Sequence, residues 1–235
     1  MTQQRMQQDT AVIEYELIHS RRKTLGITVH PDGRVTVRAP MRASADDVQD
    51  VVNKKAGWIL KKQQMFEEYE PPPPRRYVSG ETHFYLGRPY RLQVSENSRQ
   101  NVSLDGSRLL LQVRDAGNEE RKRKLLTEWY RSRARQIFPE RLDACYPTAA
   151  RHGIPFPLLK IRLMKKRWGS CSSKGTVLLS LRLIQTPQVS IDYVIFHELA
   201  HLKVLYHNKA FYALLDKMLP DWRAHREQLN KFQVA

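Results

Sequence analysis

The chain has very few cysteines and no long apolar segment. Its 235 residues include two cysteines, Cys145 and Cys171, which are too few for a disulfide framework. No stretch approaches the ~18 apolar residues of a membrane span. The opening MTQQRMQQDT also lacks the apolar segment of a signal peptide. These absences predict a soluble protein of the reducing cytoplasm that does not act in a membrane.

Acidic residues are scarce relative to basic ones. The chain holds 24 Asp and Glu against 40 Lys and Arg, a net charge of +16, and residues 121–167 alone hold 3 against 14. Such an excess favours a polyanionic partner, so a nucleic acid or a nucleotide stays open, as does a merely soluble basic surface. No P-loop or other glycine-rich phosphate-binding motif occurs.

The N-terminal half alternates in short, strand-like segments. Residues 12–40 predict an antiparallel β-meander with a turn at Pro31-Asp32-Gly33. Ser44 is the expected N-cap of a helix over residues 45–69, and the four prolines at 71–74 end it as a linker-like segment. Residues 82–113 return to strands, with a hairpin around Gly87-Arg88.

The second half reads as helices around one short sheet. Asn118 is the expected N-cap of a helix that Pro139 should kink or restart. Residues 158–183 predict two strands, LLKIRLM and TVLLSLRL, joined through RWGSCSSKG. In that joining segment, Gly169 would permit a bulge or a close approach. Residues 221–232 predict a closing helix with Trp222 and Leu229 inward.

The strongest chemical pattern is His197-Glu198-Leu199-Ala200-His201, an H-E-x-x-H arrangement. Residues four apart lie on one face of a helix, so two imidazoles at that spacing can bind one zinc ion. Glu198 beside them can accept a proton from metal-bound water. We expect Ser190 to cap this helix and Asp192 to lie in its first turn.

The neighbours of the motif are nearly all apolar, which predicts a buried helix. Two histidines and a glutamate are expensive to bury unless a cation or hydrogen bonds satisfy them. Core histidines bonded to their neighbours are the alternative. The motif arises by chance in about one or two chains per hundred of this composition, which favours the metal.

Catalytic zinc usually has three protein ligands, and His207 is the best candidate for the third. On an unbroken helix His207 would point away from His201, so the chain must turn near Tyr206. Asn208 is a good N-cap for a second helix over residues 209–219, which ends before a proline. His225 is a weaker candidate, and Cys171 is not needed as a ligand.

The spacing from His201 to His207 is similar to that of the metzincin proteases, but Val204 replaces their turn glycine and no Met-turn follows. The chain more closely resembles the YgjP-like zinc metallopeptidase family, related to the SprT-like and WLM peptidases. The resemblance rests on three segments: Arg167-Trp168-Gly169-Ser170-Cys171-Ser172, His197-Glu198-Leu199-Ala200-His201-Leu202, and His207 followed by Phe211 and Tyr212.

This resemblance implies His197, His201 and His207 as ligands of one Zn²⁺ and Glu198 as the catalytic carboxylate. The expected fold is α+β, with a β-rich N-terminal half and a zincin-like helical half that has a short antiparallel sheet beside the H-E-x-x-H helix. The expected regions are 10–116 and 117–235, with one continuous domain left open.

The expected activity is peptide hydrolysis through a metal-activated water, with a peptide or protein as substrate. Arg167, Tyr206 and Tyr212 are candidate donors to the oxyanion. A metal-dependent nucleotide pyrophosphatase or phosphohydrolase and a DNA-associated SprT-like protease are the alternatives. The oligomeric state is left open by the sequence.

Overall fold

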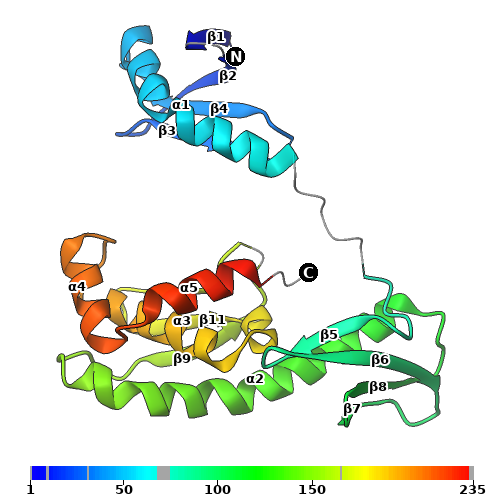
Figure 1. Cartoon of the computed structure of the whole chain (residues 1–235). Coiled ribbons are helices and arrows are strands. Elements are labelled where there is room, and N and C mark those ends of the chain that lie inside the picture. Colours follow the sequence, from blue (N-terminus) through cyan, green and yellow to red (C-terminus); the bar gives the residue numbers. More distant parts are fainter. Residues whose placement is uncertain (1, 9–10, 31, 68–74, 165, 233–235) are drawn as a thin grey trace. The chain divides into compact units, whose positions relative to one another are not determined.

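The computed structural model describes residues 2–8, 11–30, 32–67, 75–164 and 166–232 (Figure 1). It divides into two compact units, Met1–Pro73 and Pro74–Ala235. The prolines at 71–74, expected to form a linker, lie outside the described residues, as does Pro31 of the expected turn. The β-strands of residues 82–113 therefore group with the C-terminal helices.

The first unit is a four-stranded sheet with one helix packed on it. The strands are β1 (Thr2–Gln8), β2 (Ala11–Ser20), β3 (Gly26–Val29) and β4 (Val35–Pro40), in the order β1-β2-β4-β3. The expected antiparallel meander is wrong, because β4 inserts beside β2 in the parallel sense and leaves β3 at the edge. The added strand β1 has a polar sequence, TQQRMQQ, that gave no strand signal.

Helix α1 (Ala45–Glu67) covers one face of this sheet. Ser44 caps it, because its hydroxyl accepts the N–H of Asp47 at 3.1 Å and its own N–H donates to the Asp47 carboxylate at 3.0 Å. The expected end at residue 69 lies outside the described residues. The buried core between helix and sheet consists of Ile13, Tyr15, Leu17, Val35, Val37, Ala39, Val48, Val52, Ala56 and Ile59.

The second unit is built on one long helix, α2 (Glu119–Ala150). Asn118 caps it as predicted, accepting the N–H of Arg121 at 2.9 Å. The helix runs past Pro139 as a single element, so the expected restart there is wrong. Its buried face, which includes Leu126, Ala134, Phe138 and Leu142, contributes to a core shared by nearly every element of this unit.

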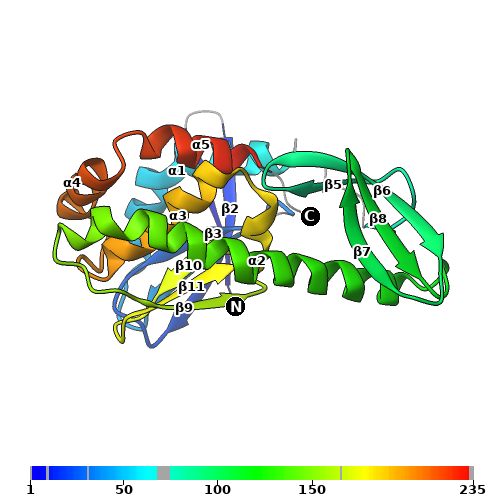
Figure 2. The same cartoon turned by 90° about the horizontal axis from the view of Figure 1, so that it is seen from below.

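A sheet of β5 (Thr82–Tyr85), β6 (Arg88–Glu96), β7 (Asn101–Asp105) and β8 (Arg108–Val113) lies beside the N-terminal part of α2 (Figure 2). Its order is β5-β6-β8-β7. The β5–β6 hairpin forms as predicted, and its turn reaches the segment before the H-E-x-x-H helix.

That turn requires a glycine. The N–H groups of Leu86 and Gly87 donate to the carbonyls of Ile184 and Gln185 at 3.0 and 3.1 Å. Gly87 has φ +79°, and a Cβ on it would lie 2.7 Å from the side chain of Pro187. The hairpin therefore fixes the backbone immediately before the metal-motif helix.

The sheet near that helix has three strands, β9 (Leu158–Arg162), β10 (Gly169–Cys171) and β11 (Thr176–Ser180), in the order β10-β11-β9. The sequence predicted two strands here. The joining segment supplies β10, which pairs antiparallel with β11, whereas β9 is parallel to β11. The second expected strand also ends early, because Leu181–Gln185 forms a 3₁₀ turn.

Three helices complete the unit: α3 (Gln188–His201), α4 (Lys209–Met218) and α5 (Trp222–Lys231). Trp222 and Leu229 of α5 are buried, as predicted. With strands mainly in the N-terminal half and helices in the C-terminal half, the chain has the predicted α+β fold. Among the described residues, every helix is too short or too polar to cross a lipid bilayer.

We expect acid to destabilise the second unit through His83, whose side chain is almost fully buried. Burial, helped by the nearby charge of Arg75, lowers the pKa of His83 to about 4. Because the unfolded chain binds this proton below about pH 6.5 and the folded chain does not, stability should fall between pH 6.5 and 4, by about 1–3 kcal/mol.

The measurement is the urea-unfolding free energy of metal-free protein across this pH range, compared with a His83→Phe variant of similar volume. The variant should show the shallower pH dependence. Equal slopes for both proteins would contradict the assignment.

Candidate metal centre

Helix α3 presents His197 and His201 on one face. Burial is nearly complete along the helix, with Ile191, Val194, Ile195 and Leu199 in the core, as the apolar sequence predicted. The two histidine rings lie with their centroids 4.9 Å apart. The two histidines therefore share one face of an otherwise largely buried helix.

The start of α3 differs from the prediction. The helix begins at Gln188 after Pro187, so Ser190 is a buried residue of the first turn rather than the N-cap. Asp192 lies beyond the first turn and accepts two hydrogen bonds from Arg141 of α2, at 2.8 and 2.7 Å. This bidentate ion pair ties α3 to α2.

The chain turns between α3 and α4 as predicted, but the turn begins directly after His201 rather than near Tyr206. The N–H of Val204 donates to the carbonyl of Ala200 at 2.9 Å, and the corner ends at Asn208, whose side chain caps α4 by accepting the N–H of Phe211 at 3.0 Å. The second helix thus starts where it was predicted and ends one residue early, at Met218. This corner carries His207 back toward α3.

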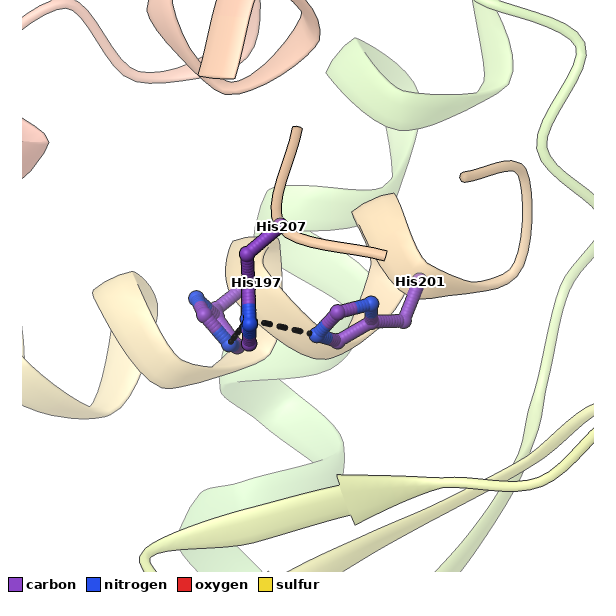
Figure 3. A group of neighbouring side chains, drawn as sticks. All are labelled: His197, His201 and His207. Carbon is purple, nitrogen blue, oxygen red and sulfur yellow. Dashed lines mark hydrogen bonds between the residues drawn. The ribbon is translucent and has the colours of Figure 1, made fainter. Parts of the chain in front are cut away.

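The three imidazoles converge on one point (Figure 3). Nε2 of His207 lies 3.0 Å from Nε2 of His201 and 3.1 Å from Nε2 of His197. Three nitrogens bound to one zinc at about 2.05 Å in a tetrahedral arrangement would be about 3.3 Å apart. The three nitrogens therefore have the spacing of a metal site, slightly contracted.

Hydrogen bonding in the corner fixes the tautomer of one ring. Nδ1 of His201 lies 3.1 Å from the carbonyl of Val204, which can only accept, so Nδ1 carries the proton and Nε2 offers a lone pair. A single proton on Nε2 of His207 cannot serve both neighbouring rings with good geometry. A cation satisfies all three nitrogens together, so the residues present fit a metal ion.

Aromatic side chains hold the rings in place. Phe211 of α4 is fully buried and contacts all three histidines, with ring centroids 5.1, 4.5 and 4.8 Å from His197, His201 and His207. Tyr212 stacks on both His207 and Trp222 of α5, and its ring also meets Phe211 edge to face. The aromatic-rich helix of the sequence pattern thus packs directly against the histidine cluster.

Glu198 points toward the small sheet. Its side chain is buried beside Gly169 of β10, where an added Cβ would lie 2.6 Å from the carboxylate Oε1. The close approach expected at Gly169 is therefore confirmed. Burial raises the pKa of Glu198 to about 8, and the positive charge of Arg167 opposes that shift. A bound cation would oppose it further.

This contact predicts a large effect of Gly169→Ala. The new methyl group must displace the Glu198 carboxylate, and a misplacement of about 1 Å can lower a rate about 100-fold. We expect kcat on a peptide substrate to fall by that order while bound metal stays near one equivalent.

Gly57→Ala is the matched control, since its added Cβ would meet no atom within 4 Å outside its own stretch of helix. A normal kcat for Gly169→Ala would show that the close contact is not needed.

The other candidate residues lie around the cluster in different roles. Tyr206 is 77% exposed beside His207, whereas Tyr212 is engaged in ring stacking. Trp168 is half-buried against the core, under the guanidinium of Arg182 at 5.7 Å. His225 on α5 is not part of the histidine cluster found among the described residues.

Two arginines contribute positive charge to the site. Arg167, which precedes β10, opposes the burial that raises the pKa of Glu198. Burial is the main cause of the lowered pKa of His197, and the charge of Arg226 on α5 adds to it. The contribution of Arg226 was not predicted from the sequence, because it depends on the packing of Trp222 of α5 against Tyr193 of α3.

Comparison with known proteins identifies the family. The model of the YgjP-like, metallopeptidase domain matches residues 23–232. The chain belongs to the YgjP-like family. It thus carries a metallopeptidase domain, and the family implies a divalent metal and a peptide or protein substrate. The match extends across both compact units.

Among solved structures, the metallopeptidase zymogen of Pyrococcus abyssi abylysin is similar over part of the chain. The two are 24% identical, and the alignment covers 39% of this chain and 90% of that one, with a TM-score of 0.35. A search of curated proteins found no match.

Proposed function

We propose that this YgjP-like chain is a zinc-dependent peptidase in which His197, His201 and His207 hold one Zn²⁺ and Glu198 is the general base. The observation that carries the proposal is the convergence of three Nε2 atoms within 4.8 Å of one another, with Nδ1 of His201 tied to a backbone carbonyl. Three histidines leave the fourth position of a tetrahedral ion open to water or substrate.

The zinc ion, when bound, would lower the pKa of a water toward about 7 and polarise the carbonyl of the scissile bond. Glu198 is the only carboxylate on α3 besides Asp192, which is engaged by Arg141. Glu198 accepts the proton of the attacking water and delivers it to the leaving amine. Its buried position beside Gly169 keeps other water from competing for that proton.

Strand β10 is the proposed substrate-binding edge. It is one of the two edge strands of its sheet, and it packs against α3, so one row of its backbone groups is free to pair with an extended peptide. The exposed Tyr206 and the cationic Arg167 are the candidates for a donor to the oxyanion, since Tyr212 is held in a stack.

A metal-dependent phosphohydrolase is the second candidate, and the charge distribution favours it. Residues 74–235 hold 29 Lys and Arg against 14 Asp and Glu, whereas residues 1–73 hold 11 against 10. The unit with the histidine cluster therefore attracts anions. The same charge keeps a nucleic-acid partner, and proteolysis on DNA, in consideration.

One experiment separates these functions. The purified protein, reconstituted with one equivalent of zinc, is assayed on fluorogenic peptide libraries and on a panel of nucleoside triphosphates. Peptide cleavage that a chelator abolishes and zinc restores would support the proposal. Release of phosphate or pyrophosphate without peptide cleavage would overturn it. DNA binding is tested separately by its dependence on salt concentration.

A further inference from the structure

The first unit carries an apolar groove between strand β3 and helix α1. The groove has a volume of about 230 Å³ and is lined by Leu25, Ile27, Val51, Lys55 and Trp58. Small-molecule pockets are usually larger, roughly 300–1,000 Å³. Trp58 is 45% exposed, which is unusual for so large an aromatic side chain on a helix. The groove has the size and lining expected for a single bulky apolar side chain.

The groove lies next to a free sheet edge. Among the described residues β3 pairs only with β4, which leaves its other side open. The N–H of His30 donates to the carbonyl of Arg34 at 2.8 Å, which makes His30 and Arg34 a hydrogen-bonded pair. In an antiparallel pair of strands, every second pair of opposite residues is hydrogen-bonded. By that alternation Ile27 and Val29 turn their N–H and C=O groups outward, toward a strand that could be added.

The opposite face of the same edge is positively charged. The guanidinium of Arg22 lies against Gly26, where an added Cβ would be 2.8 Å from Nη2. Its Nε is buried and has no hydrogen-bond partner among the described residues. The Arg22 side chain as a whole is only partly buried, so a carboxylate docked at this edge would lie against its positive charge. Lys55 adds a second positive charge, at the groove itself.

We propose that the β3 edge binds an acidic, extended segment of a partner protein as an added strand. Side chains of a strand alternate between the two faces of a sheet. The partner residue opposite Ile27 therefore enters the groove beside Trp58, and the residues on either side of it project to the face of Arg22. The recognised pattern is a bulky apolar residue flanked by Asp or Glu.

Charge complementarity argues for the occupant. Arg22 and Lys55 would attract an acidic segment of a partner protein and would repel a basic one. The proposal is independent of the peptidase assignment, since it concerns the first unit alone.

The test uses the full chain and a fluorescein-labelled peptide, Ser-Glu-Phe-Glu-Val-Ser, with binding followed by fluorescence anisotropy. We expect Trp58→Ala to weaken binding by at least about 10-fold, as for an anchor residue. Arg22→Gln should weaken it by about 10-fold or more, through the lost charge-assisted hydrogen bond. Arg21→Gln removes one charge from an exposed neighbour and should change it little.

Two further probes test the strand geometry and the charge pattern. Two peptides, N-methylated at alternate sets of amides, should differ in affinity, because only one set of amides faces β3. The peptide methylated on the set that faces β3 should lose binding, and the other should keep it. The Ser-Lys-Phe-Lys-Val-Ser peptide should not bind. The proposal is overturned if the intact chain fails to bind the acidic peptide, if it binds the lysine peptide equally well, or if either variant or N-methylation has no effect.

Discussion

Glu198→Gln is expected to retain one equivalent of zinc and to lose peptide hydrolysis by about 10²–10⁴-fold, the usual contribution of a general base. The amide keeps the size of the carboxylate but cannot accept a proton. Glu198 is buried, and its pKa is raised to about 8. Replacement by a neutral isostere therefore removes a desolvation cost and should not lower the thermal midpoint of the metal-free protein.

The matched control is Glu227→Gln on α5, whose carboxylate pairs with Lys231 at 2.7 Å on the surface. This variant should keep normal kcat. Metal content by plasma mass spectrometry, kcat and the thermal midpoint are measured on the same preparations. Hydrolysis by Glu198→Gln at the wild-type rate would remove the general-base role, whereas loss of its zinc would indicate a role as ligand.

His207→Ala is expected to lower zinc affinity by about 100- to 1,000-fold. This range follows if one ligand contributes about a quarter of the roughly 10–16 kcal/mol of binding free energy of a structural zinc site. The variant keeps His197 and His201 on α3 but lacks the third imidazole beside them. Because Phe211 loses its contact with that ring, α4 should also pack less firmly.

His225→Ala is the control for this second prediction, since His225 lies on α5 outside the cluster. Competition with a zinc-binding dye gives the affinity of each variant. The control should bind zinc as tightly as the wild-type chain. If His207→Ala did the same, the third ligand would have to be another residue, and the three-histidine site would be wrong.

Most of the candidate site was predictable because its geometry is local. The i, i+4 spacing of His197 and His201 needs only a helix, and Asn208 marks the start of the next one. The short segment between the two helices can adopt few conformations, and His207 lies close to α3 as expected. Gly169 was predictable only as a place of close approach. The contact of Gly169 with Glu198 depends on the pairing of β10, and this strand of three residues is too short to be predicted from its sequence pattern.

The strand order could not be predicted, for a different reason. Residues 12–40 have the alternation of strands, but the same pattern fits a meander and the observed order, in which β4 lies between β2 and β3. Pairing between strands that are not adjacent in sequence leaves no local signal. The restart expected at Pro139 does not occur. Packing of Phe138 and Leu142 in the core outweighs the hydrogen bond that a proline removes.

The β5–β6 turn has a consequence for dissecting the enzyme into smaller pieces. A fragment that begins at residue 117 would leave the carbonyls of Ile184 and Gln185 without their donors and would strip Leu109, Leu111 and Val113 from the hydrophobic core. Such a fragment would retain every candidate catalytic side chain and still have an unanchored start to α3. The shortest autonomous piece with an intact histidine cluster should therefore begin near residue 74.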